Sequence, residues 1–420
     1  MKTSSQASFF FIATFVAYLL STTSIPCQTQ AGWTILEDMP TVAGAIDPVV
    51  LDGKVYVFGG KLDEIESSDT VWVLEPEVGW TFGGKMPDSL EAIVTEEWNG
   101  KIYLFGGHSH PDFVYRTEVM TYDPETQVFD TVSQLLDEKA WFTSAVLGGK
   151  IYIIGGDDYT DVVSTVDIFN PMDNTWESGP SLQTGRAGAS ADTLEEKIYV
   201  TGGGAYTSAD AFNSVEIYDP AQPSLGWVTS SKTMLTRRGF HSCKNVGGKL
   251  FAVGGAVHVV NESFSNWVEY FDPETGEWVD VEPMNFARRE LGAAVLGGYL
   301  YAFGGMTGPF GNATAIGKVE KYQVVNASHE ASLFFDNKLA CFPNPFSGQT
   351  TIGYQLDRMA DVQLSVYDLF GRPVWTHSNE NQMPGEHTVT FDGSALPKGF
   401  YCAVLELGGS HRFNARLVVQ

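Results

Sequence analysis

Four cations recur at one place in a repeating sequence. Each lies sixteen residues before the first of two adjacent glycines, and the four are Lys139, Arg186, Arg238 and Arg288. Such a group would suit a carboxylate or an acidic sugar, because arginine binds carboxylates through two parallel hydrogen bonds. We therefore predict that these four residues contact a ligand.

Residues next to these cations add aromatic and acid–base chemistry. The further binding candidates are Trp141, Phe240, His241 and Arg289, and Glu290 is the candidate acid–base residue if the protein is an enzyme. Aromatic rings can stack on a ligand, and a glutamate can move a proton. Simpler roles are an ion pair for Glu290 and a hydrogen-bonded core position for His241. The residues form no complete catalytic set, so the sequence favours binding over catalysis.

Histidines and aspartates in the loops after the glycine pairs could bind a metal. These residues are His108, His110, Asp112, Asp157, Asp158 and His258. A metal centre needs three or four converging ligands, and exposed polar loops explain the same residues equally well. We therefore predict no metal site and no cofactor.

The glycine pairs themselves define the architecture. They close six apolar runs, at Gly59-Gly60, Gly106-Gly107, Gly155-Gly156, Gly202-Gly203, Gly254-Gly255 and Gly304-Gly305. The steps between first glycines are 47, 49, 47, 52 and 50 residues. A period near fifty indicates one supersecondary unit copied in tandem.

Two more strands are expected in each unit after the glycine pair. The third strand ends in Asp-Pro or a related pair, and the fourth begins with Trp80, Phe129, Trp176, Trp227 or Trp278 in the first five units. The sixth unit has a third strand at residues 319–324 but no aromatic fourth strand. We expect residues 32–40, with Trp33, to supply that strand, which would close the ring and leave no open edge.

Residues 32–325 resemble kelch repeats in the glycine pair, the Tyr-Asp-Pro strand and the tryptophan together. The resemblance implies an all-β, six-bladed propeller whose ligands meet the mouth of a central channel. It also implies a second role for the recurring cations, because kelch repeats commonly carry an arginine there that ties neighbouring blades together. Kelch propellers that mutarotate N-acetylneuraminic acid use such a mouth.

The last eighty residues change in character after a linker at 326–340. Residues 341–420 contain six or seven short alternating runs, which suggest a small, Ig-like β-sandwich. They resemble the C-terminal sorting domain of type IX secretion substrates through Pro343, Asn344, Pro345, Tyr367, Asp368, Gly371, Leu396, Gly399 and Tyr401. The resemblance implies a Gram-negative bacterium, contact with type IX machinery and delivery to the surface or medium. Whether Cys341 and Cys402 pair is left open.

The other end and the charge restrict location and partners. Residues 1–31 read as a secretory signal peptide, with a short basic start and an apolar run of about a dozen residues. No other stretch could span a bilayer, so we expect no transmembrane segment in the mature chain. The formal net charge of −26 argues against nucleic-acid binding, because phosphates would be repelled.

The sequence therefore predicts a secreted or cell-surface binding or adhesion module for an extracellular carbohydrate or protein. The alternative is a carbohydrate-active enzyme resembling the N-acetylneuraminate epimerases (mutarotases).

Overall fold

The structure is a computed structural model. It describes residues 32–63, 65–76, 78–110, 112–205, 210–258, 264–309, 312–324, 339–342, 346, 348–356, 359–367, 372–407 and 411–419. The predicted signal peptide, residues 326–338 of the predicted linker, and the motif residues Pro343, Asn344, Pro345, Asp368 and Gly371 lie outside these ranges.

The repeats form six antiparallel four-stranded sheets. The first three comprise β2 (Val49–Leu51), β3 (Lys54–Phe58), β4 (Thr70–Glu75) and β5 (Gly79–Lys85); β6 (Val94–Trp98), β7 (Lys101–Phe105), β10 (Glu118–Asp123) and β11 (Val128–Gln134); and β12 (Thr143–Leu147), β13 (Lys150–Ile154), β14 (Val166–Asn170) and β15 (Thr175–Ser178). The others comprise β16 (Ala187–Leu194), β17 (Lys197–Gly204), β18 (Val215–Tyr218) and β19 (Trp227–Thr229); β20 (Ser242–Val246), β21 (Lys249–Val253), β22 (Val268–Asp272) and β23 (Glu277–Val281); and β24 (Gly292–Leu296), β25 (Tyr299–Phe303), β28 (Val319–Gln323) and β1 (Trp33–Ile35).

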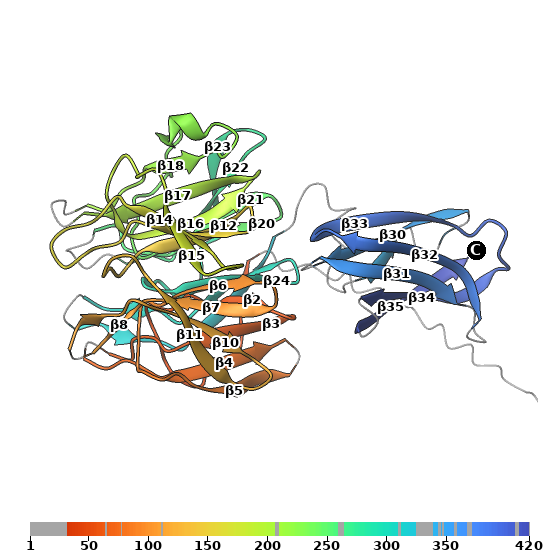
Figure 1. Ribbon diagram of the computed structural model, residues 1–420, viewed down its shortest axis with the longest axis horizontal. Coiled ribbons are helices and arrows are strands. Elements are labelled where there is room, and N and C mark those ends of the chain that lie inside the picture. Colours follow the sequence, from red (N-terminus) through yellow and green to blue (C-terminus); the bar gives the residue numbers. More distant parts are fainter. Residues whose placement is uncertain are drawn as a thin grey trace, which may run out of the picture. The chain divides into compact units, whose positions relative to one another are not determined.

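The first strands of the six sheets contact one another in a closed circle. The contacts run from β2 through β6, β12, β16, β20 and β24 and return to β2. Figure 1 shows these strands toward the middle of the repeat region, with fourth strands such as β5 and β23 outside them. The second strands are buried on both faces, as in β3 and β13, because a neighbouring sheet covers each side.

The glycine pairs join each sheet to the next. In five of the six units the amide of the second glycine donates to a carbonyl in the following unit, as in Gly156 to Arg186 (2.9 Å) and Gly203 to Arg238 (3.0 Å). Both glycines of each pair have positive φ. In the same five units a Cβ on the first glycine would press against that carbonyl oxygen, so only glycine permits this close approach.

The last sheet is completed from the start of the chain. Strand β1 pairs with β28, with Trp33 opposite Tyr322, as predicted for residues 32–40. The amide of Gly305 donates to the carbonyl of Ala43 (2.8 Å), so the junction between last and first units matches the others. Short additions are the hairpins β8 (His108–Ser109) with β9 (Val114–Tyr115) and β26 (Met306–Thr307) with β27 (Thr314–Ala315), and the 3₁₀ turn η1 (Pro223–Leu225).

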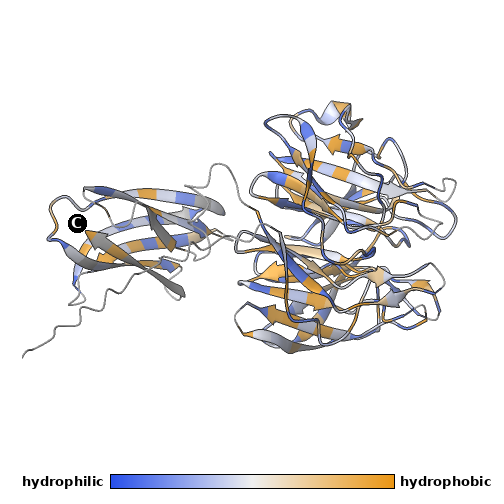
Figure 2. Ribbon diagram, turned by 180° about the vertical axis from the view of Figure 1, so that it is seen from behind, coloured by the Kyte–Doolittle hydropathy of each residue, from blue (hydrophilic) through white to orange (hydrophobic). Residues whose placement is uncertain are grey.

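The C-terminal part contains two further antiparallel sheets. One comprises β29 (Leu339–Phe342), β30 (Gln349–Leu356) and β33 (Gly385–Asp392), and the other β32 (Pro373–Gln382), β31 (Ala360–Tyr367), β34 (Gly399–Leu407) and β35 (His411–Val419). Strands of both sheets contribute to one hydrophobic cluster, for example Ile352, Leu364 and Leu417. Figure 2 shows hydrophobic segments on the strands of both parts of the chain.

Candidate functional site

The four recurring cations are buried, and each faces a carboxylate on the third strand of its own sheet. Nζ of Lys139 lies 2.5 Å from Oδ2 of Asp167, and Nη2 of Arg186, Arg238 and Arg288 lies 2.6, 2.6 and 3.0 Å from Oε1 of Glu216, Glu269 and Glu320. The side chains of all eight are at most 7% exposed. Burial leaves little of these cations for a ligand.

The other hydrogen bonds of each arginine–glutamate pair also go to groups of the protein. Nη1 of Arg238 donates to the carbonyl of Gly254 (2.9 Å), and Glu269 accepts from the amides of Leu235 and Thr236. Burial lowers the pKa of Arg238, although Glu269 partly offsets that effect. The pair therefore fixes the entry loop, the glycine pair and the third strand of one sheet together.

The two units without a cation also lack the carboxylate. Ala43 and Leu90 occupy the cation's place, and Trp72 and Met120 occupy the carboxylate's place. Each apolar pair lies within a single hydrophobic cluster. This exchange of charged for apolar pairs favours the structural role of the cations. Ligand contact by these four residues stays a prediction.

Six residues at one repeat position, which we call the axial residues, surround the centre of the circle. They are Ala45, Ala92, Trp141, Gly188, Phe240 and Glu290, with φ between 51° and 60°. Five backbone hydrogen bonds of 2.7–2.9 Å join neighbouring members; the amide of Ala45, for example, donates to the carbonyl of Glu290. Positive φ in five non-glycine residues costs roughly 1 kcal/mol each and is common at functional sites.

Two axial residues form an aromatic pair. The rings of Trp141 and Phe240 meet edge to face, 5.2 Å apart. Gly188 stands between them in the circle, and a Cβ there would lie 2.8 Å from the Phe240 ring. The glycine therefore makes room for the aromatic contact.

The axial residues border a cavity of about 100 Å³. Its lining includes the predicted residues Trp141, Phe240, His241 and Glu290 and the hydroxyl residues Thr143, Ser144, Ser190 and Ser242. Asp47 and Lys244, which sequence analysis missed, also line it. The structure thus brings four of the predicted site residues together and places the cations of the repeat elsewhere.

Lys244 faces three carboxylates. Nζ lies 3.6 Å from Oδ1 of Asp47. Burial lowers the pKa of Lys244, but Asp47, Asp192 and Glu96 outweigh it, so the net direction is upward. Burial raises the pKa of Glu96 to about 7, although Lys244 and a hydrogen bond from Ser144 oppose the shift. This charged group carries more acid than base.

His241 and Glu290 are held by protein groups. Nε2 of His241 lies 2.9 Å from the Thr201 hydroxyl, and burial, with the charge of Arg238, lowers the pKa of His241 well below its usual value. The imidazole is therefore neutral. Nη1 of Arg289 donates to Oε1 of Glu290, which is the ion pair considered from the sequence.

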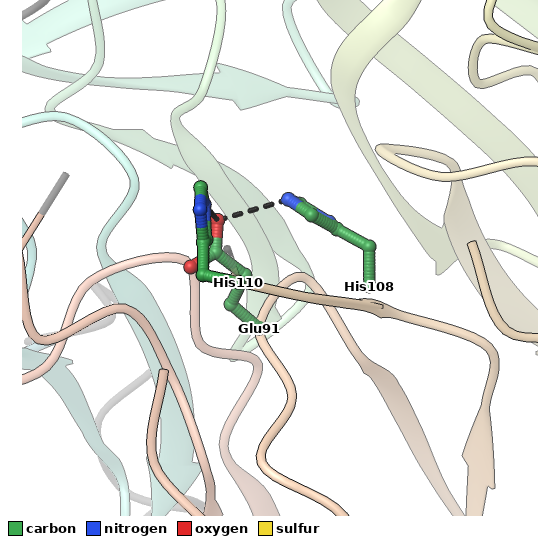
Figure 3. A group of neighbouring side chains, drawn as sticks. All are labelled: Glu91, His108 and His110. Atoms are coloured by element: carbon green, nitrogen blue, oxygen red, sulfur yellow. Dashed lines mark hydrogen bonds and ion pairs between the residues drawn. The ribbon is translucent and has the colours of Figure 1, made fainter. Parts of the chain in front are cut away.

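A second group of side chains lies beside this cavity. Glu91, the neighbour of Ala92, contacts His108 and His110, and the side chains of all three are at most 3% exposed (Figure 3). Asp157 accepts instead from the Tyr115 hydroxyl (2.5 Å), and Asp158 caps its own turn. The other loop candidates, exposed Asp112 and His258 paired with Asp210, do not belong to the group.

The missed residues had signals in the sequence. Glu96, Asp192 and Lys244 all lie ten residues before the first glycine of their units, as the cations lie sixteen before it. Because side chains alternate along a strand, this second position points to the same channel as the axial residues. Glu91 is found by register, since its backbone pairs with that of His108.

The circle of repeated sheets defines an all-β repeat protein with a cavity bordered by the axial residues. A model of the KLHDC2/KLHL20/DRC7 Kelch-repeats domain matches residues 33–203 and 141–328. The chain belongs to the kelch-repeat family. A model of the secretion system C-terminal sorting domain matches residues 340–420, so the protein also carries a sorting tail, as the sequence predicted.

Curated relatives resemble only part of this chain. Kelch-like protein 26 of Danio rerio is 27% identical over 53% of this chain and 36% of that protein. Kelch-like protein 23 of Homo sapiens is 26% identical over 50% of this chain and 36% of its own length. The chain thus spans about a third of the length of these relatives.

One solved structure, that of YjhT, covers more. It matches with a TM-score of 0.60 over 70% of this chain and 98% of YjhT, at 16% identity. This likeness shows a shared fold.

The sorting tail indicates secretion or cell-surface localisation and implies the type IX secretion machinery. Among the described residues, we find no helix with the length and hydrophobicity that crossing a bilayer requires.

Proposed function

We propose that the protein is a secreted or surface-displayed binding module that holds the end of a neutral carbohydrate chain in its axial cavity. In this proposal the six sheets are the blades of a closed propeller at residues 32–325. Residues 1–31 are the signal peptide, 326–340 the linker, and 341–420 a β-sandwich that directs export from a Gram-negative cell.

The observation that carries the proposal is the aromatic pair beside hydroxyl groups. The faces of Trp141 and Phe240 can pack against the C–H groups of a sugar ring, while Thr143, Ser144, Ser190 and Ser242 can exchange hydrogen bonds with its hydroxyls. Small-molecule pockets are built in this way, from aromatic walls and a few polar groups.

Charge supports a neutral ligand. The repeat cations are buried against carboxylates, and Lys244 faces Asp47, Glu96 and Asp192. An acidic sugar would meet Glu290 and Asp47 in the lining without an uncommitted cation among the described lining residues to balance it. A neutral sugar avoids this repulsion.

The volume of the cavity supports a ligand that enters by the end of a glycan chain. A cavity of about 100 Å³ is smaller than the roughly 300–1,000 Å³ of pockets that enclose a whole ligand. A terminal residue could enter while the rest of the glycan stays outside. A protein side chain or chain end is the other class of ligand that fits this description.

A glycan array tests the ligand class. We expect the exported protein to retain neutral glycans and to bind sialylated versions of the same glycans no better. The wild type is compared with Trp141→Ala and with Trp267→Ala, which removes an exposed tryptophan outside the cavity. Preference for acidic glycans, or equal binding by Trp141→Ala, would contradict the proposal.

An acidic-sugar epimerase is the second candidate, because Glu290 lines the same cavity. Under our proposal, the protein does not accelerate the anomerisation of N-acetylneuraminic acid, which NMR can follow directly. Acceleration that is lost in Glu290→Gln would favour the enzyme.

A further inference from the structure

Glu91, His108 and His110 have the chemistry and the placement of a transition-metal site. The carboxylate and imidazoles come from two segments that are held together by their backbones. Glu91 and His108 exchange two backbone hydrogen bonds of 2.9 Å, which sets these two residues opposite each other. His110 follows two residues later in the turn of the β8–β9 hairpin, and its ring reaches the same carboxylate.

The ligand atoms already converge. Nε2 of His108 lies 3.0 Å and Nε2 of His110 3.2 Å from the same oxygen, Oε1 of Glu91. Figure 3 shows both rings turned toward that carboxylate. Zinc bonds of about 2.0–2.2 Å in tetrahedral geometry separate neighbouring ligand atoms by roughly 3.3 Å, so one ion fits with little movement.

Charge also points to a cation. Glu91 is 1% exposed, and its partners among the described residues are two imidazoles and the Ser67 hydroxyl. The buried acids Glu216, Glu269 and Glu320 each face an arginine instead. A buried carboxylate without a full opposite charge is costly, and a divalent ion would supply that charge.

Each ring offers Nε2 to an ion, and its Nδ1 faces the other way. Nδ1 of His108 and Nδ1 of His110 are buried, and neither has a hydrogen-bond partner in the described structure. Phe113 lies against both rings, with centroids 6.1 Å from His108 and 4.2 Å from His110. Such an apolar cover strengthens electrostatic attraction between ligands and metal.

We propose that Glu91, His108 and His110 bind one divalent transition metal of the zinc type, with water as the fourth ligand. Two nitrogens and one carboxylate oxygen favour zinc over calcium, which prefers six or more oxygens. The ring centroids of Trp141 and His108 are 5.5 Å apart, so the ion would lie directly behind an aromatic wall of the axial cavity. The site departs from the sequence prediction of no metal, because that prediction lacked Glu91.

Metal content tests the site in the untagged protein. After exposure to zinc and dialysis, we expect about one zinc per chain in the wild type and below about 0.1 in Glu91→Gln and His110→Ala. Added Co²⁺ should give the visible absorption bands of a tetrahedral nitrogen and oxygen site, absent in both variants. His258→Ala is the matched control, since His258 contacts Asp210 instead, and it should keep its zinc.

Stability gives a second readout. Zinc should raise the Tm of the wild type and of His258→Ala by several degrees, and circular dichroism should show that Glu91→Gln is folded but unresponsive. A wild type that holds no more zinc than folded Glu91→Gln would overturn the proposal, as would a Tm that zinc leaves unchanged. Loss of zinc in the His258→Ala control would equally overturn it.

Discussion

At the scale of single residues, burial determines the role of the repeat cations. Arg186, Arg238 and Arg288 are positioned by the repeat and neutralised by carboxylates of the same sheet. A charge buried with its partner is tolerable, whereas a charge left alone in the interior is costly. The same comparison singles out Glu91, whose partners are imidazoles.

The buried arginine–glutamate pairs predict that a single substitution lowers stability more than substitution of both partners. Arg238→Leu leaves Glu269 buried without its cation and should lower the free energy of unfolding by about 3–5 kcal/mol. The double variant Arg238→Leu, Glu269→Met copies the Leu90 and Met120 of the second unit and should recover most of that loss. Urea denaturation of the single and double variants measures both values. Equal losses in the two would show that the pair is not the unit of stability.

Glu96 predicts a pH dependence. Its pKa is about 7 in the folded protein, above the usual value, so the folded state holds this proton more tightly than the unfolded chain. Its contribution to stability is complete below about pH 4.5 and is lost as the pH rises through about 7. Glu96→Gln keeps an amide in place of the acid and should be more stabilising, relative to wild type, at pH 8 than at pH 5.

Denaturation at the two pH values measures this difference. Glu125→Gln, which changes an exposed turn, is the control and should show none. If the free energies of unfolding of Glu96→Gln and wild type differed by the same amount at pH 5 and pH 8, the assigned protonation of Glu96 would be contradicted.

At the scale of elements, the glycine pair connects each repeat unit to its neighbour. Gly304 has positive φ, and a Cβ there would overlap the carbonyl oxygen of Ala43 in the first unit. Gly304→Ala should cost about 2–4 kcal/mol, because strain and a clash add. Gly298→Ala, at φ 73° with no atom within 4 Å of the added Cβ, should cost roughly 1 kcal/mol. Thermal or urea denaturation would contradict this role if the two losses were equal.

Local signals made the strands predictable. Each apolar run, glycine pair and aromatic fourth strand lies within one short window, and the missing sixth strand could be found because the pattern was interrupted there. The site was less accessible, because Arg238 and Glu269 are about thirty residues apart in sequence. Comparing the six units would have helped to find these ion pairs, because the first two units lack both the cation and the carboxylate.

The axial site depends on the closing of the circle, which brings six segments together. Trp141 and Phe240 belong to different units, and their contact needs the glycine of a third. Counting residues along one repeat identifies each axial residue, but it does not show which residues of other units that residue contacts. The Glu91 group lies within one unit and was missed for a different reason, because its carboxylate precedes the first strand whereas its histidines follow the glycine pair.

At the scale of the whole molecule, the sorting tail separates delivery from binding. Deleting residues 340–420 should leave the repeat region inside the cell envelope, because the type IX machinery would no longer engage it. Protease treatment of intact cells measures the accessible fraction. Trp141→Ala, which leaves the sorting tail unchanged, should be delivered normally. Unchanged surface delivery after the deletion would refute the role of the tail.

Calorimetric titration of the axial cavity tests the central claim most directly. A neutral glycan selected on the array is titrated into wild type, Trp141→Ala, Phe240→Ala and the control Trp267→Ala. The account predicts that each cavity substitution weakens Kd by about tenfold or more, the loss of roughly 1.4 kcal/mol of ring contact, while the control matches wild type. Equal affinity in all four proteins would place the ligand outside the cavity and contradict the account.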